Sequence, residues 1–266
     1  KYVDTLDTKD ATVDKIISLM VGRTIFQEAP HIPSTDNQPI VLEVKNLNNG
    51  RFVRNISFKL HKGEILGFAG LMGAGRTELA RALIGADPKT AGKIFLRGKE
   101  VKIKSPSDAV KSGIGYLSED RKKYGLLLIQ NVTFNVILSS IPSFSNKFGF
   151  LKTKPAGAIT RDAIKQLSIR TPSENQYLKN LSGGNQQKVV IGKWLEIAPG
   201  LVLLDDPTRG VDIGAKVELF RLVREIAAEG KGILFRSTEI SELTSLCDRI
   251  VVVKDGVSTR EVSGVD

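Results

Sequence analysis

One short stretch, residues 70–77, limits the possible folds of this chain more than any other. It reads Gly-Leu-Met-Gly-Ala-Gly-Arg-Thr and fits the phosphate-loop pattern G-x-x-x-x-G-K-[ST] at every required position except Arg76. An apolar strand is predicted before it, over 63–69, and a helix after it, over 77–84. Backbone N–H groups of small residues can close around phosphate oxygens, and a helix N-terminus adds its partial positive charge. The stretch therefore predicts a phosphate site on an α/β fold.

Side chains of the same stretch add to the prediction. A cation at position 76 reaches the outer phosphates of a nucleotide, and the Thr77 hydroxyl can ligate Mg²⁺. A glycine turn before a core helix is the simpler alternative, and the motifs that follow weigh against it. The residues predicted to bind the nucleotide are Gly70, Leu71, Met72, Gly73, Ala74, Gly75, Arg76, Thr77 and Glu78.

The second motif is an apolar strand that ends in two carboxylates. Residues 201–204 are Leu-Val-Leu-Leu, and Asp205 and Asp206 follow them, as in a Walker B motif. At the C-terminal edge of a parallel sheet these acids would face the phosphate loop, where Asp205 is suited to hold Mg²⁺ directly or through water. A capped strand end with a solvated acid pair is the alternative, and the phosphate loop earlier in the chain makes it less favoured.

The third motif is Leu-Ser-Gly-Gly-Asn-Gln-Gln-Lys, at 181–188, which resembles the signature sequence of ABC ATPases. Residues 206–212, Asp-Pro-Thr-Arg-Gly-Val-Asp, resemble the passage from Walker B to the D-loop of that family. A serine and two glycines at the start of a long helix offer hydroxyl and backbone donors to an anion. Taken alone, the stretch could simply cap a helix; the order of the three motifs favours the family. The signature residues are Leu181, Ser182, Gly183, Gly184, Asn185 and Gln186.

The resemblance covers about residues 40 to 258 and implies a fold. It is the α/β fold of P-loop NTPases, in which a RecA-like parallel core joins an antiparallel β portion and a helical subdomain, here expected at about 107–190. Apolar strands that alternate with helices agree with such a core. The family also implies ATP and Mg²⁺ as cofactors, with Mg²⁺ held by Thr77, Asp205 and Glu119. In this family two nucleotide-binding domains pair head to tail, so that each ATP lies between one phosphate loop and the other domain's signature.

The particular residues within the motifs narrow the resemblance to one group of ABC proteins. Residues 70–78, 118–122 and 181–188 look like the second half of the tandem ATP-binding subunit of bacterial monosaccharide importers, the ribose, galactose and xylose group. This implies an ATPase at the cytoplasmic face of the bacterial membrane that couples ATP to sugar uptake. The implied partners are the first nucleotide-binding domain of the same polypeptide, transmembrane permease subunits and, indirectly, a sugar-binding protein. No nucleic acid is expected.

The opening of the chain is predicted to belong to a preceding domain. A short helix is expected over 11–21, and a polar stretch containing Pro30, Pro33 and Pro39 has the composition of a linker. Residues 20–23, Met-Val-Gly-Arg, resemble the end of the importer's first half. We therefore predict a domain tail and linker over 1–38 and an ATP-binding domain over 39–266.

Four departures from the family pattern gather at one predicted site. Arg76 replaces the phosphate-loop Lys, and its planar fork is bulkier than an ammonium. Three positions with expected catalytic roles also differ: Asp206 stands for the usual Glu, Thr238 for a His and Glu119 for a Gln. Losing a well-placed general base costs about 10²–10⁴-fold in rate. We therefore predict that this half binds ATP with Mg²⁺ and turns it over slowly, unless Arg76 and Asp206 compensate one another.

Composition leaves two other classes of function open. The net charge of +10 and a pI of about 9.6 would suit a soluble ABC ATPase acting on nucleic acid or the ribosome. The basic residues are scattered, however, and no coiled-coil insertion lies between the phosphate loop and the signature. A purely structural half that binds no nucleotide is the other alternative. Among the aromatic residues, Phe52 is the candidate to stack on adenine, and a place in the core is equally expected for it.

Overall fold

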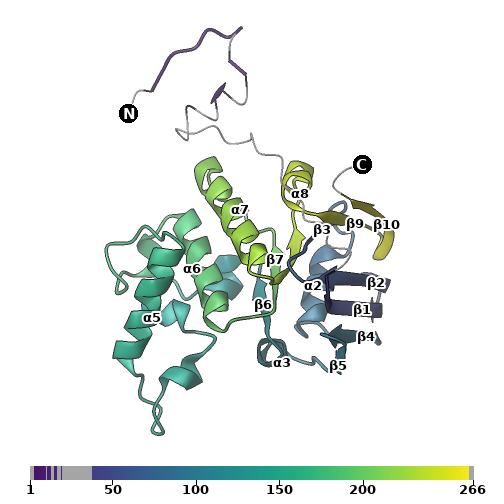
Figure 1. Cartoon of the computed structure of the whole chain (residues 1–266), viewed down its shortest axis with the longest axis horizontal. Helices are drawn as coiled ribbons and strands as arrows, with labels where there is room; N and C mark the ends of the chain where they lie inside the picture. The colour runs from purple at the N-terminus through teal and green to yellow at the C-terminus, as the bar shows by residue number, and fades with distance from the viewer. Residues whose placement is uncertain (1–2, 10, 13–14, 17–18, 20–37, 264–266) are drawn as a thin grey trace.

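The computed structural model describes residues 3–9, 11–12, 15–16, 19 and 38–263 of the 266-residue chain. Most of the helix predicted over 11–21 and nearly all of the predicted linker lie outside the described residues. From residue 38 onward the structure is continuous to residue 263. It contains both of the predicted sheets, together with the helices that cover them (Figure 1).

A six-stranded sheet forms the centre of the molecule. Its strands are β3 (Ile65–Ala69), β6 (Ile114–Leu117), β7 (Leu201–Asp205), β8 (Gly232–Arg236), β9 (Arg249–Lys254) and β10 (Val257–Ser263). They lie in the order β10-β9-β3-β8-β7-β6, and all neighbours are parallel except the edge pair β10 and β9. Strands β3, β7 and β8 are nearly continuous apolar runs because both faces of this sheet are covered. The predicted parallel core is confirmed.

A second sheet is antiparallel and has four strands. They are β1 (Ile40–Asn49), β2 (Val53–His61), β4 (Ala91–Leu96) and β5 (Lys99–Val101), in the order β2-β1-β4-β5. Buried and exposed residues largely alternate along β2, as expected for a strand with one face on the core. One hydrophobic cluster joins this sheet, the central sheet and the helix α2 (Arg76–Leu83). The predicted antiparallel portion is thereby confirmed, and it packs against the helix that follows the phosphate loop.

The remaining helices surround the central sheet. They are α3 (Pro106–Lys111), α4 (Val132–Val136), α5 (Thr153–Gln166), α6 (Gly183–Glu196), α7 (Ile213–Ala228) and α8 (Ile240–Leu246), with short turns η1 (Arg121–Gly125), η2 (Ile141–Phe144) and η3 (Leu178–Asn180). Helices α5 and α6 lie on one side of the sheet, opposite β1, β2, β4 and β5 (Figure 1). Helix α4 contacts both α5 and α6. These three helices form a unit that begins after β6 and returns to the sheet through α6.

Lys193 is a buried charge on α6. Its Nζ donates to the carbonyl oxygen of Gly125 at 2.8 Å and lies 4.5 Å from the ring centroid of Trp194. Burial lowers the pKa of Lys193 from the usual 10.5 to about 8. The ammonium group thus ties α6 to the end of η1, the turn that follows Glu119 and Asp120 in the sequence.

We expect the stability of the wild type to rise with pH relative to that of a Lys193→Met variant. Between pH 8 and 10.5 the unfolded chain holds a Lys193 proton that the folded chain has lost, so raising the pH favours folding. The gain across this window is at most about 3 kcal/mol. Urea unfolding at several pH values, followed by the fluorescence of Trp194, the chain's single Trp, measures it. Parallel pH curves for the two proteins would contradict the lowered pKa.

Candidate nucleotide site

The phosphate loop, residues 70–77, connects β3 to α2 as predicted. Gly75 is the N-cap of α2 and has φ 99° and ψ 9°, a left-handed conformation that an L-residue adopts only with strain. A side chain at Gly75 would also overlap the carbonyl oxygen of Phe52. Met72, at the tip of the loop, is 90% exposed. The tip of the loop is therefore exposed, and the backbone at Gly75 packs against the backbone of Phe52.

Two turns support the loop from behind. The N–H of Gly256, in the turn between β9 and β10, donates to the carbonyl oxygen of Ala74 at 2.9 Å. The N–H of Arg54, at the start of β2, donates to the carbonyl oxygen of Gly256 at 2.6 Å, next to the turn between β1 and β2. Phe52, in that second turn, is 42% exposed and is not a core residue. Its proposed stacking on adenine stays a prediction.

Arg76, the departure in the phosphate loop, is the first residue of α2 and only 5% exposed. Its Nη1 donates to the backbone carbonyl oxygen of Ser237 at 2.8 Å. Burial, and then the nearby Arg236, lower the pKa of the Arg76 guanidinium. This cation therefore bridges the phosphate loop to the end of β8.

The two Walker B carboxylates stand in different surroundings. Asp205, the last residue of β7, is buried, and burial raises its pKa; its Oδ2 accepts a hydrogen bond from the Tyr116 hydroxyl at 2.9 Å. Asp206 has φ 51° and its N–H donates to the carbonyl oxygen of Arg236 at 2.9 Å. The Thr238 hydroxyl donates to Oδ2 of Asp206 at 3.3 Å, which is long for such a bond. The structure thus brings together Asp206 and Thr238, two of the three predicted catalytic residues.

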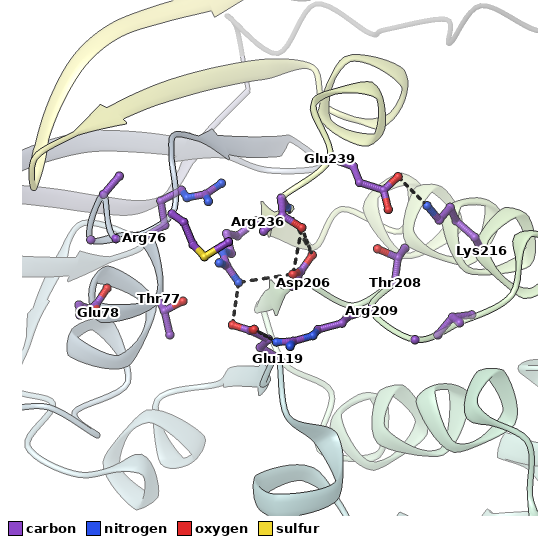
Figure 2. A pocket seen from close by; sticks show the side chains of 17 residues that line it. Arg76, Thr77, Glu78, Glu119, Asp206, Thr208, Arg209, Lys216, Arg236 and Glu239 are labelled. Atoms are coloured by element: carbon purple, nitrogen blue, oxygen red, sulfur yellow. Dashed lines mark hydrogen bonds and ion pairs between the residues drawn. The ribbon is translucent and has the colours of Figure 1, made fainter.

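Arg236, which was not predicted from the sequence, lies at the centre of this group. Its Nη1 is 3.0 Å from Oδ1 of Asp205, 3.1 Å from Oε2 of Glu119 and 3.8 Å from Oδ2 of Asp206. Figure 2 shows the guanidinium between the carboxylates of Glu119 and Asp206. Arg209 also pairs with Glu119, through Oε1. The available signal was an arginine that ends the apolar run of β8 opposite Asp205 in the register.

A pocket opens in front of these groups. The phosphate-loop residues 72–78 form one wall, and Glu119, Asp206, Arg209, Arg236 and Thr238 are among the residues on the other side. All four departures from the family pattern therefore line a single pocket. The described residues that surround it carry both signs of charge, and guanidinium groups already pair with Glu119 and Asp206.

Two of the three predicted Mg²⁺ ligands, Asp205 and Glu119, already have partners for both of their carboxylate oxygens in this arrangement. Both oxygens of Asp205 are engaged, one by Tyr116 and one by Arg236. Both oxygens of Glu119 are engaged as well, by Arg209 and Arg236. Among the described residues, no group of three or more His, Cys, Asp or Glu side chains is arranged to hold a metal. A guanidinium instead stands between the carboxylates that were predicted to share the ion.

The predicted signature residues lie at the start of α6, and none of them lines the described pocket. Ser182 is the N-cap of α6 and is exposed; its Oγ accepts a hydrogen bond from Nδ2 of Asn185 at 2.9 Å. Gln186 is buried and its Nε2 donates to the carbonyl oxygen of Leu181 at 3.1 Å. Ser182 of the signature is therefore accessible from outside the chain and takes no part in the pocket beside this chain's own phosphate loop.

Comparisons with known proteins agree with the motifs. Residues 53–209 match the family model described as ABC transporter. The chain is 48% identical over all 266 residues to the putative ribose/galactose/methyl galactoside import ATP-binding protein 2 of Burkholderia cenocepacia, and covers 52% of it. The corresponding protein 1 of Burkholderia lata is 47% identical over 266 residues, with 52% of its length covered. The chain thus spans about half the length of the curated relatives it matches.

The fold has a counterpart among solved structures. The ADP conformation of MJ1267, an ATP-binding cassette of an ABC transporter, superposes with a TM-score of 0.70 over 84% of this chain and 91% of that one. The two sequences are 21% identical, so the likeness concerns the fold. None of the described helices has the length and apolarity needed to span a bilayer.

Proposed function

Because this chain belongs to the family of ABC transporter ATP-binding domains, we propose that it binds ATP at residues 70–78 and serves as one nucleotide-binding half of a monosaccharide importer. The observation that carries this proposal is the phosphate loop, supported from behind by Phe52 and Gly256 and open in front to Asp206 and Thr238. Backbone N–H groups at the start of α2 would bind the phosphates, and Arg76 would add a buried positive charge. The relatives named as ribose and galactose importers support the sugar as cargo.

The proposed partners follow from the outward-facing signature. Ser182 is exposed and does not line this chain's own pocket, so it would complete an ATP site on a second nucleotide-binding domain, the first half of the same polypeptide. Transmembrane permease subunits would couple ATP binding and hydrolysis in this chain to sugar uptake, and a sugar-binding protein would deliver the sugar. We propose that the chain acts at the cytoplasmic face of a bacterial membrane. Specific nucleic-acid binding forms no part of the proposal.

We further propose that this half hydrolyses ATP slowly. A general base must have a free oxygen within reach of the attacking water. The carboxylate of Asp206 instead faces the Thr238 hydroxyl and lies 3.8 Å from the Arg236 guanidinium. Glu119, the third residue with a predicted catalytic role, is paired with two arginines. These contacts support slow turnover, with a cost of about 10²-fold or more relative to a site with a well-placed base.

Calorimetric titration of ATP into the chain, with phosphate release followed on the same sample, tests the proposal. We expect binding with negligible release, and an Asp206→Asn variant that binds and releases as the wild type does. Sustained release by the wild type that the variant loses would overturn the slow turnover. Absence of ATP binding would favour a purely structural half. Salt-sensitive retention of nucleic acid on a filter would favour the soluble ABC alternative.

A further inference from the structure

We propose that Arg236 is the resident cation of this half-site and takes the place of Mg²⁺, so that the chain binds ATP without a divalent ion. The inference rests on the proposed nucleotide binding and concerns the form in which the nucleotide binds. It begins from the position of the guanidinium. Nη1 of Arg236 lies within 3.1 Å of an oxygen of Asp205 and of Glu119, two of the three residues predicted to hold the ion.

Charge balance supports this assignment. Three carboxylates meet at the edge of the sheet, from Asp205, Asp206 and Glu119, and three guanidinium groups stand among or beside them. Those three are Arg76, Arg209 and Arg236. Opposite charges at these distances stabilise each other most where water is excluded, and Asp205 and Arg76 are both buried. The carboxylates are thus already neutralised, and little negative charge remains to attract a divalent ion.

The backbone keeps Arg236 in this position. It is the last residue of β8, which lies between β3 and β7, and in the register it pairs with Phe68 on one side and Asp205 on the other. Its side chain is only 11% exposed. Moving the guanidinium out of the group would take one ion-pair partner from the buried Asp205 and one from the half-buried Glu119, which is costly. A fixed strand position therefore holds the cation where a diffusible ion would otherwise bind.

The guanidinium also has donors left for a nucleotide. Arg236 lines the pocket beside the phosphate loop. Its contacts to the carboxylates of Asp205, Asp206 and Glu119 all use Nη1. A planar guanidinium can bond a carboxylate and a phosphate oxygen at the same time. The chemical class that fits is a metal-free nucleoside triphosphate, whose phosphate oxygens Arg76 and Arg236 would contact from the wall of the pocket.

The test compares ATP affinity in Mg²⁺ with ATP affinity in EDTA, by calorimetry on the full chain. For the wild type we expect the two dissociation constants to agree within about threefold. In Arg236→Met the carboxylates lose their cation and become ion ligands, and we expect ATP to bind at least about tenfold more tightly with Mg²⁺ than with EDTA. Arg81→Met is the matched control: it removes a guanidinium from its ion pair with Asp87, outside the pocket, and should keep the wild-type ratio.

A second measurement needs no nucleotide. Loss of the free Mn²⁺ signal in electron paramagnetic resonance reports Mn²⁺ bound to the protein; we expect none for the wild type at micromolar Mn²⁺ and binding by Arg236→Met. Wild-type ATP binding that requires Mg²⁺, or tight Mn²⁺ binding by the wild type, would overturn the inference while leaving the proposed function intact. Absence of ATP binding in both Mg²⁺ and EDTA would refute the proposed function and the metal-free binding together. Both wild-type measurements remain decisive even if Arg236→Met fails to fold.

Discussion

Replacing Gly75 by alanine is expected to weaken ATP binding by about 100-fold or more and to lower the free energy of unfolding by about 2–4 kcal/mol. Gly75 has φ 99°, and an added Cβ would overlap the carbonyl oxygen of Phe52. The loop would have to move away from the turn that supports it. At least two charge-assisted hydrogen bonds to phosphate would then be lost, each worth about 1.5–3 kcal/mol.

Gly73→Ala is the matched control for this experiment. Gly73 also has a positive φ, of 80°, but a Cβ there would meet no atom within 4 Å. The control therefore carries the backbone strain, about 1–2 kcal/mol, without the clash. Calorimetric titration and urea unfolding of both variants separate the two effects. Equal losses of affinity in Gly73→Ala and Gly75→Ala would show that the support behind the loop does not matter for binding.

Substituting Arg76 by methionine should lower the affinity for ATP by about 10–150-fold, the range expected for one charge-assisted contact. The side chain is almost fully buried, and methionine fills much of the same volume. The expected loss thus comes from the charge and from the bond to the Ser237 carbonyl oxygen.

Arg76→Lys separates these two contributions. It keeps a positive charge at the phosphates, and an ammonium cannot reproduce the planar fork that reaches β8. We expect its affinity to stay within about fivefold of the wild type, because phosphate recognition needs the charge more than the fork. If Lys weakens ATP binding as much as Met does, Arg76 acts by joining the loop to β8 and not by meeting the phosphates.

Much of the fold could be predicted because the phosphate loop and the Walker B acids each follow a regular, buried strand. The residues before Gly70 and before Asp205 are unbroken apolar runs, which a strand buried on both faces requires. Strand β1 was harder: it continues to Asn49, past the apolar run that predicts 40–44. Asn46 has φ 51° and its N–H donates to Oγ of Ser57, so a bulge carries the strand through a polar stretch. Local pattern reading does not detect such a bulge.

The residues that line the site were easier to predict than the hydrogen bonds and ion pairs between them. The departures at Arg76, Glu119, Asp206 and Thr238 line one pocket, as the motif order indicated. Tyr116 stands in the apolar strand β6 with no motif around it, and nothing in the sequence signals that its hydroxyl bonds to Asp205. Arg236 was missed because a lone arginine after an apolar run has no motif around it. Its importance depends on the register between β7 and β8, which residues more than 30 positions apart determine.

The two turns behind the phosphate loop also affect when the chain gains its activity during synthesis. Nε of Arg54 donates to the carbonyl oxygen of Asp255, 201 positions later, and the neighbouring Gly256 bonds to Ala74. Residues 70–77 leave the ribosome long before this partner has been made, and contacts of such separation form late. A nascent chain that stops short of residue 255 contains the whole motif and the turn of Phe52 but lacks the second support, the turn between β9 and β10. We expect nucleotide binding to begin only when the hairpin of β9 and β10 has emerged and docked.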